Sequence, residues 1–121
     1  MSSYQEHQNL IKKFKLAIHK EIMGIRVFDR HVGLLFTKRG TPIKINKKGM
    51  ADLWGIINLH EMQIHIEIEA KTGAGRQTKE QKVWQKFIED FGGKYFLMRD
   101  VEETIEDIKE YIDDCLQNVY K

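Results

Sequence analysis

One segment of the chain, residues 64–71, alternates at every position between apolar and polar side chains. Its apolar positions are isoleucines or alanine, and the positions between them carry His65, Glu67, Glu69 and Lys71. Because successive side chains of an extended strand point to opposite faces, this pattern predicts a strand with an isoleucine face turned toward a core. Such a strand needs partner strands and a packing layer, so the remaining chain must supply a sheet and elements that cover it.

Further short strands are predicted on both sides of this segment, at residues 25–28, 32–37, 43–45, 53–57 and 95–98. Turn residues separate the first three of them, which favours a β-meander. The fourth is expected to pair antiparallel with residues 64–70, with residues 58–63 as the connecting loop.

Three helices complete the pattern. Apolar residues at steps of three and four predict an amphipathic helix at about residues 9–23, with a lysine-rich outer face. Thr78 followed by Gln81 resembles a capping box, and Asp100 with Glu103 repeats the signal before a final helix. The helix after Thr78 has an apolar stripe that we expect in the core: Trp84, Phe87, Ile88 and Phe91.

The chain has 121 residues, 41% of them apolar, which is enough for one domain with a core and too little for two of ordinary size. We therefore expect a single domain over residues 1–121. The element order α, several β, α, β, α predicts an α/β fold in which helices flank a mixed β-sheet.

Charge is distributed unevenly, although the formal net charge is only +2. Lysines crowd the first half and acids dominate after Asp100, so a polyanion is expected to meet the first half. The single cysteine, Cys115, excludes an internal disulfide and a thiolate zinc site. The sequence has neither an apolar leader nor a run of ~20 apolar residues, so we expect a soluble protein of a reducing compartment.

Asp52, Glu69 and Lys71 are candidates for chemistry. If residues 53–57 and 64–70 form a hairpin, Asp52 lies alongside Glu69, and Lys71 projects from the same face as Glu69. Carboxylate oxygens, together with the backbone carbonyl of Ala70, are ligands suited to Mg²⁺ or Mn²⁺. Such an ion assists phosphodiester hydrolysis, and Lys71 could orient or help deprotonate water or stabilise developing charge. The competing interpretation is that the polar positions of residues 64–71 form only the solvated face of a strand.

The order and spacing of several motifs resemble the VRR-NUC domains of the PD-(D/E)XK nuclease superfamily, over about residues 10–112. The carrying segments are Gly49-Met50-Ala51-Asp52-Leu53, Ile66-Glu67-Ile68-Glu69-Ala70-Lys71-Thr72, and Gly75-Arg76-Gln77-Thr78 with Gln81; Phe91-Gly92-Gly93 and Val101-Glu102-Glu103 match the usual tail.

This resemblance implies a restriction-endonuclease-like core and a metal-dependent DNA endonuclease, with stand-alone relatives in phages and bacteria and thus a cytoplasmic setting. It implies that Asp52 and Glu69 bind Mg²⁺ or Mn²⁺, that Lys71 completes the catalytic site, and that Gln81 points into it. Many relatives add an acid on the first helix; the matching position here is near Asn9, and Glu6 and Glu21 are one turn before and three turns after it.

Contacts with DNA are expected from basic residues and one histidine: His31, Lys38, Arg39, Arg76 and Lys79, with Lys47 and Lys48 as further phosphate contacts. We expect the other histidines to be mostly surface residues. Similarity to archaeal Holliday-junction resolvases suggests a homodimer acting on branched DNA. The alternatives are a monomer that cuts flaps or ends, and a non-catalytic DNA-binding module of the same fold.

Overall fold

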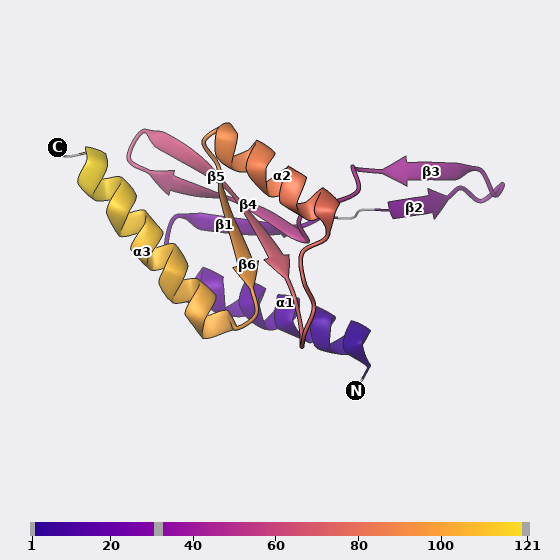
Figure 1. Ribbon diagram of the computed structural model, residues 1–121. Helices are drawn as coiled ribbons and strands as arrows, with labels where there is room; N and C mark the ends of the chain where they lie inside the picture. Colours follow the sequence, from indigo (N-terminus) through magenta and orange to yellow (C-terminus); the bar gives the residue numbers. More distant parts are fainter. Residues whose placement is uncertain (1, 31–32, 120–121) are drawn as a thin grey trace.

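The computed structural model describes residues 2–30 and 33–119 (Figure 1). Its elements, in chain order, are α1 (Ser3–Glu21), β1 (Ile25–Asp29), β2 (Gly33–Phe36), β3 (Pro42–Ile45), β4 (Leu53–Leu59), β5 (Met62–Ala70), α2 (Lys79–Asp90), β6 (Lys94–Met98) and α3 (Val101–Val119). Within the described residues, no helix combines the length and the apolar character needed to cross a bilayer.

The main sheet has four strands in the order β1-β4-β5-β6. β4 pairs antiparallel with both β1 and β5, whereas β5 and β6 run parallel, so the predicted mixed sheet flanked by helices is confirmed. The predicted β4–β5 hairpin is also confirmed, with Leu53 opposite Ile68. Its loop is much shorter than expected because Leu59 already pairs with Met62; His60 turns the chain with a φ of 52°.

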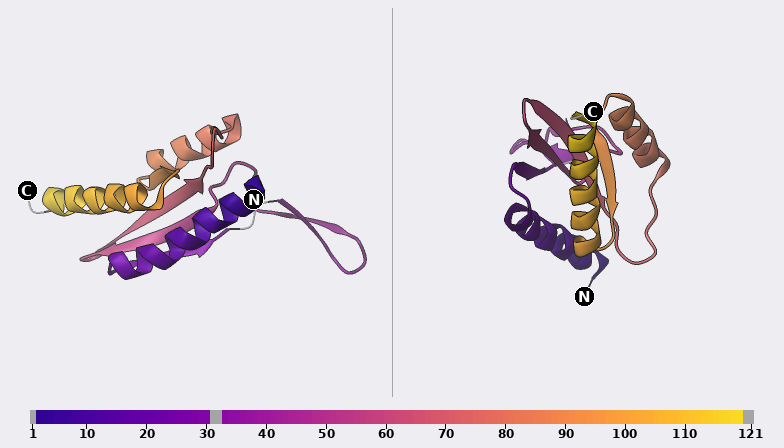
Figure 2. Two further views of the ribbon diagram at one scale, coloured as in Figure 1. Left: turned by 90° about the horizontal axis from the view of Figure 1, so that it is seen from below. Right: turned by 90° about the vertical axis from the view of Figure 1, so that its left-hand side faces the viewer.

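The isoleucine face of β5 packs on the layer formed by α1 and α3, which lie side by side, while α2 covers the opposite face (Figures 1 and 2). The core contains Ile66 and Ile68 of β5 with Phe14 and Ile18 of α1 and Ile108 of α3, and none of these exposes more than 1% of its surface. Burying such side chains is the main stabilising contribution to the fold.

The predicted β-meander is wrong. β2 and β3 form a two-stranded hairpin of their own, which extends away from the body of the molecule (Figure 1). β1 pairs with β4 instead, and the backbone N–H of Arg30 still donates to the carbonyl of Asp52 before the chain leaves the sheet. Pairing β1 with β4 places Ile25 and Val27 in the core, and this long-range gain outweighs the local turn signals.

Two helices differ from their predicted form. α1 begins at Ser3, earlier than expected, because Ser2 and Gln5 form a capping box. In α2 the capping box of Thr78 and Gln81 is confirmed, but the apolar stripe is not core throughout: Ile88 is buried, whereas Phe87 is 46% and Phe91 77% exposed. α2 covers only part of its sheet face, and Phe87 and Phe91 lie on the side of the stripe that faces solvent.

Candidate metal centre

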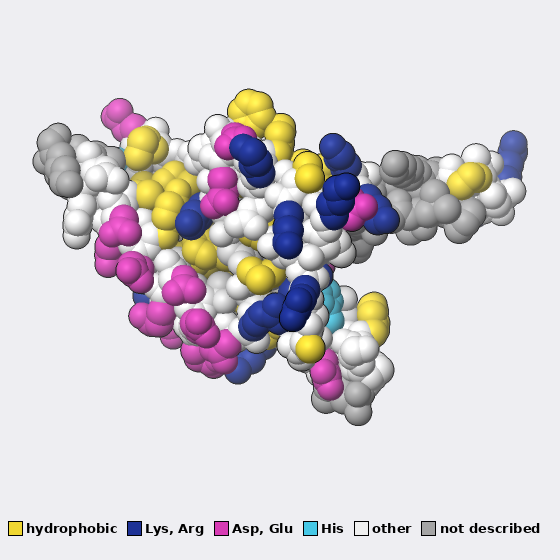
Figure 3. All heavy atoms as spheres, in the orientation of Figure 1, with side chains coloured by type: hydrophobic (Ala, Val, Ile, Leu, Met, Phe, Trp, Pro, Cys, Tyr) yellow, Lys and Arg dark blue, Asp and Glu magenta, His cyan; other side chains and the backbone are white. Residues whose placement is uncertain are grey.

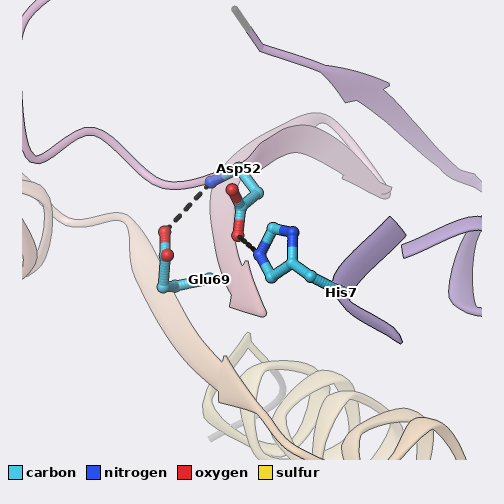
Figure 4. Close-up of side chains that lie close together, drawn as sticks. All are labelled: His7, Asp52 and Glu69. Carbon is cyan, nitrogen blue, oxygen red and sulfur yellow. Dashed lines mark hydrogen bonds and ion pairs between the residues drawn. The ribbon is translucent and has the colours of Figure 1, made fainter. Parts of the chain in front are cut away.

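Asp52 and Glu69 lie side by side where β4 begins and β5 ends (Figure 4). The backbone N–H of Asp52 donates to Oε2 of Glu69 at 3.1 Å, and the N–H of Ala70 donates to Oδ2 of Asp52 at 2.9 Å. These reciprocal bonds follow from the hairpin register, which pairs the neighbouring Leu53 with Ile68. The two carboxylates are therefore held by backbone donors of rigid strands.

His7 approaches the same oxygens from α1 (Figure 4). Its Nε2 lies 3.1 Å from Oδ2 of Asp52 and 3.1 Å from the carbonyl oxygen of Ala70. One side-chain ligand atom from each of His7, Asp52 and Glu69 lies within 4.8 Å of the others. The imidazole is thus aimed at the oxygens that the sequence pattern had selected as metal ligands.

Gln81 and Lys71 complete the surroundings of Glu69. Nε2 of Gln81 donates to Oε1 of Glu69 at 3.0 Å, while the amide oxygen of Gln81 accepts the N–H of Thr78 in the capping box of α2. Nζ of Lys71 lies 3.8 Å from Oε1 of Glu69, and its backbone N–H donates to the carbonyl of Met98 on β6. The fold therefore brings together Asp52, Glu69, Ala70, Lys71 and Gln81, as the sequence analysis expected.

The surroundings of Glu69 perturb its protonation. Burial, reinforced by the negative charge of Asp52, raises the pKa of Glu69 to about 8, although Lys71 opposes the rise. In the absence of a cation, a proton on Glu69 relieves the repulsion. A divalent cation among these groups would replace that proton and stabilise both carboxylates in their charged form.

The chemistry of the donors fits a divalent cation. Two carboxylates and a backbone carbonyl are hard oxygen ligands of the kind that Mg²⁺ and Mn²⁺ accept, and the hollow that Asp52 lines leaves room for water. The neutral imidazole of His7 would add one nitrogen ligand through Nε2. A mixed set of this kind suits Mn²⁺ better than Mg²⁺, because Mg²⁺ depends more strictly on oxygen.

His7 was missed by the sequence analysis, which placed it among surface histidines and looked for an acid on the first helix. Glu6 is exposed, and Glu21 pairs with Lys109 through a 3.2 Å contact. Asn9 is exposed and borders a hollow that Asp52 also lines. The missed signal was the Ser2–Gln5 capping box, which extends the helix far enough to include His7.

The interpretation of residues 64–71 as a solvated face is wrong for Glu67, which is completely buried, and for Glu69, which is 3% exposed. Arg30 binds both carboxylate oxygens of Glu67, with Nη2 to Oε2 at 2.8 Å, and His65 contacts it as well. Nε1 of Trp84 donates to Oε1 at 2.8 Å. Burial alone would raise the pKa of Glu67, but these hydrogen bonds lower it below its ordinary value.

The residues predicted to contact DNA fall into groups, and one group, Lys47, Lys48 and Lys79, lines a common hollow beside α2. Lys38 and Arg39 are exposed at the turn between β2 and β3, whereas Arg76 and Lys79 are exposed beside the start of α2. His31 lies outside the described residues. Basic side chains gather around α2 and the loop that leads into it, and acidic side chains cover α3 (Figure 3).

The glycine-containing loop between β5 and α2 is held in place by Arg99, which follows β6. The guanidinium of Arg99 donates to the carbonyl of Gly75 at 2.6 Å and to that of Gly73 at 3.3 Å. The N–H of Gly75 is used within the loop, where it donates to Thr72. The loop therefore has fixed backbone contacts beside the candidate metal centre.

Comparisons with protein-family models, with curated proteins and with solved structures found no match to this chain.

Proposed function

We propose that the chain is a Mg²⁺- or Mn²⁺-dependent DNA endonuclease that hydrolyses phosphodiester bonds in branched or structured DNA. The observation that carries the proposal is the convergence of Asp52, Glu69, His7 and the Ala70 carbonyl, with Lys71 3.8 Å from Glu69. Under this proposal the sheet β1-β4-β5-β6 with α1 and α2 is a restriction-endonuclease-like core, as the motif resemblance implies.

The cation would be held by Asp52, Glu69, the carbonyl of Ala70 and the imidazole of His7. When bound, the cation neutralises charge on the phosphate and makes a water molecule bound to it a stronger acid. Backbone N–H groups already hold one oxygen of each carboxylate, so Asp52 and Glu69 are positioned side by side before a cation binds. Preorganised ligands of this kind lower the cost of reaching the transition state.

Lys71 would act on water or on the phosphate, whereas Gln81 would act on Glu69. Only 16% of the Lys71 side chain is exposed, and its ammonium lies at the edge of the carboxylate pair, where it can orient water or stabilise charge on the phosphate. Gln81 donates to Glu69 and directs the other oxygen of that carboxylate toward Asp52. Gln81 is therefore a positioning residue.

DNA is the favoured substrate because basic residues lie on more than one side of the centre. Lys12 and Lys15 of α1 border a hollow that Asp52 also lines, and Arg76 and Lys79 lie near the loop that follows β5. Such groups fix a phosphate backbone without reading its sequence. A homodimer would present two centres to the two strands of a junction.

Purified protein incubated with labelled junction, flap, splayed and linear DNA tests the proposal. We expect cleavage of a branched substrate with Mg²⁺ or Mn²⁺, no cleavage with excess chelator, and loss of cleavage in Asp52→Asn and Lys71→Ala. Matched controls are Asp113→Asn and Lys20→Ala, which alter exposed residues. Chelator-resistant cutting, or unchanged cutting by Asp52→Asn, would refute the site; DNA binding without cutting under every metal condition would favour the non-catalytic module.

A further inference from the structure

An aromatic row lies on the sheet face that α2 leaves partly uncovered. Phe28 of β1 is directly opposite Trp54 of β4, and their ring centroids are 4.9 Å apart. The ring of His65 on β5 lies 6.1 Å from that of Trp54 and inclined to it by only 17°. Phe28 is 45% exposed and the side chain of His65 40%. We refer to Phe28, Trp54 and His65 as the aromatic row.

A hollow of about 520 Å³ opens beside the aromatic row, lined by Trp54 and His65 on one side and by Trp84 and Ile88 of α2 on the other. Asp29 and Arg30 contribute to its rim. This volume is within the range of roughly 300–1,000 Å³ typical of small-molecule sites.

The walls of the hollow are fixed by the buried carboxylate of Glu67. Arg30, just after β1, and Trp84 of α2 each bind Glu67, and the guanidinium carbon of Arg30 lies 5.7 Å from the centre of the Trp84 ring. His65 contacts the same carboxylate. A single buried acid therefore holds three lining side chains, so the aromatic surfaces are preorganised before any ligand arrives.

The aromatic row is the immediate neighbour of the candidate metal centre. Trp54 is opposite Glu67, and Glu67 and Glu69 point to the same face two residues apart on β5, a separation of about 6.5–7 Å. A second hollow, of about 530 Å³, is lined by Asp52 and shares Asp29 and Arg30 with the first. A phosphate at the metal centre thus has an aromatic hollow on one side and the lysines of α1 on the other.

Charge indicates which part of a nucleotide suits the aromatic hollow. Arg30 is neutralised by Glu67, and Asp29 at the rim pairs with Lys15 through a contact of 2.5 Å, so this hollow offers no unpaired cation for a phosphate among the side chains for which contacts are described. Aromatic faces instead stack on nucleobases of any sequence. Bases inside a duplex are already stacked on each other and do not reach a side pocket unless they are flipped out.

We propose that the aromatic row binds an unstacked nucleobase next to the scissile phosphate, so that the substrate class is DNA with unpaired nucleotides at the cut site. The position of this base next to a phosphate that is cut rests on the proposed nuclease function. Binding of the base itself does not require DNA cleavage. A flap, a splayed arm or a junction branch point offers such nucleotides, whereas a blunt uninterrupted duplex does not.

Binding in chelator, where metal-dependent cutting is absent, tests this proposal. Fluorescence anisotropy with a labelled single-stranded 12-mer and with the blunt duplex of the same sequence gives the two affinities. We expect preference for the single strand, a loss of single-strand affinity of about 5- to 100-fold in Trp54→Ala, and a smaller loss in Phe28→Ala. Duplex affinity should change little in both variants.

Control variants separate stacking from damage to the fold. Trp54→Phe retains an aromatic face and should recover most of the single-strand affinity. Phe91→Ala alters a ring that is 77% exposed at the C-cap of α2 and should leave this affinity unchanged. Circular dichroism checks folding, and Phe28→Ala serves if Trp54→Ala does not fold. Equal affinity for both DNAs, or unchanged single-strand affinity in folded Trp54→Ala and Phe28→Ala, would overturn the proposal.

The two proposals fail separately. Metal-dependent cleavage that is insensitive to Trp54→Ala and Phe28→Ala, without single-strand preference, would leave the nuclease proposal standing and overturn the base-binding site. Selective single-strand binding lost in Trp54→Ala, in a protein that cuts nothing with either metal, would support the base-binding site and refute the nuclease.

Discussion

Nε2 of His7 lies 3.1 Å from Oδ2 of Asp52, although the two residues are 45 positions apart in the chain. The same nitrogen lies 3.1 Å from the carbonyl of Ala70, so α1 reaches over the point where β4 begins and β5 ends. The helix consequently does more than cover the sheet. It places an imidazole nitrogen beside the two carboxylates of the candidate metal centre.

His7→Ala is expected to weaken Mn²⁺ binding by at least about tenfold, since even residues that only support a metal ligand cost 10- to 100-fold when they are removed. Mg²⁺ binding should fall less, because Mg²⁺ favours oxygen ligands and keeps several waters. Isothermal titration of each ion into wild type and variant measures the effect.

His60→Asn provides the matched control, because His60 lies in the β4–β5 turn and asparagine tolerates its positive φ. It should leave both affinities unchanged. An equal loss of Mg²⁺ and Mn²⁺ affinity in His7→Ala would mean that His7 only holds Asp52 and the Ala70 carbonyl in place and does not discriminate between the ions. No loss of affinity for either ion would remove His7 from the ligand set.

The sequence was sufficient to predict those residues of the candidate metal centre whose positions depend on strand periodicity. Alternation put Glu69 and Lys71 on one face, and the short hairpin put Asp52 beside Glu69. His7 could not be found in the same way, because the first two turns of α1 are polar and carry almost no apolar periodicity. Only the Ser2–Gln5 cap marks where that helix begins.

The prediction of the fold was limited by strand pairings and side-chain contacts between residues that are far apart in the sequence. Local turn signals describe β2 and β3 as a hairpin well, but they do not show that β1 would pair with β4. The burial of Glu67 likewise depends on two partners that are distant in the sequence, Arg30 and Trp84. A charged residue in an alternating strand looks the same in the sequence whether it faces water or a guanidinium that pairs with it inside the protein.

Arg30→Met is expected to destabilise the protein by about 3–5 kcal/mol, because it leaves the fully buried carboxylate of Glu67 without its main partner. Urea denaturation followed by circular dichroism measures the change. The double variant Arg30→Met with Glu67→Gln should be more stable than Arg30→Met alone, since it removes the unpaired charge. If the double variant is the less stable of the two, burial of an uncompensated charge is not the cause.

Gly49→Ala is expected to disturb the contact between the segment before β4 and the start of α2. A Cβ on Gly49 would lie 2.6 Å from the carbonyl oxygen of Glu80, and the φ of 97° is itself unfavourable for alanine. We expect a loss of stability of about 1–3 kcal/mol and reduced metal affinity, because Gln81 and its contact with Glu69 move with α2.

Gly40→Ala separates the clash from the backbone strain. Gly40 also has a positive φ, of 83°, but a Cβ there would have no atom within 4 Å. Its substitution should therefore cost less stability and leave metal affinity intact. Thermal unfolding and metal titration of both variants make the comparison, and equal effects would assign the Gly49 result to backbone strain alone.

The raised pKa of Glu69 predicts how stability depends on pH in metal-free protein. Glu69 has an ordinary pKa of 4.5 and a pKa of about 8 in the fold, where burial and Asp52 favour its protonated form. Between these values the native state holds a proton that the unfolded chain releases, so the free energy of unfolding must fall as pH rises toward 8. The depressed pKa of Glu67 acts below this range, at acidic pH.

Melting temperatures between pH 5 and pH 8.5, with chelator and with Mn²⁺, measure this dependence. Glu69→Gln mimics the protonated side chain and should flatten the part of the profile that belongs to Glu69, whereas Glu110→Gln, at an exposed position of α3, should not. Mn²⁺ replaces the proton, so its stabilising effect should grow with pH in wild type and be much weaker in Glu69→Gln. A Glu69→Gln profile that parallels wild type in chelator would show that Glu69 does not produce the pH dependence.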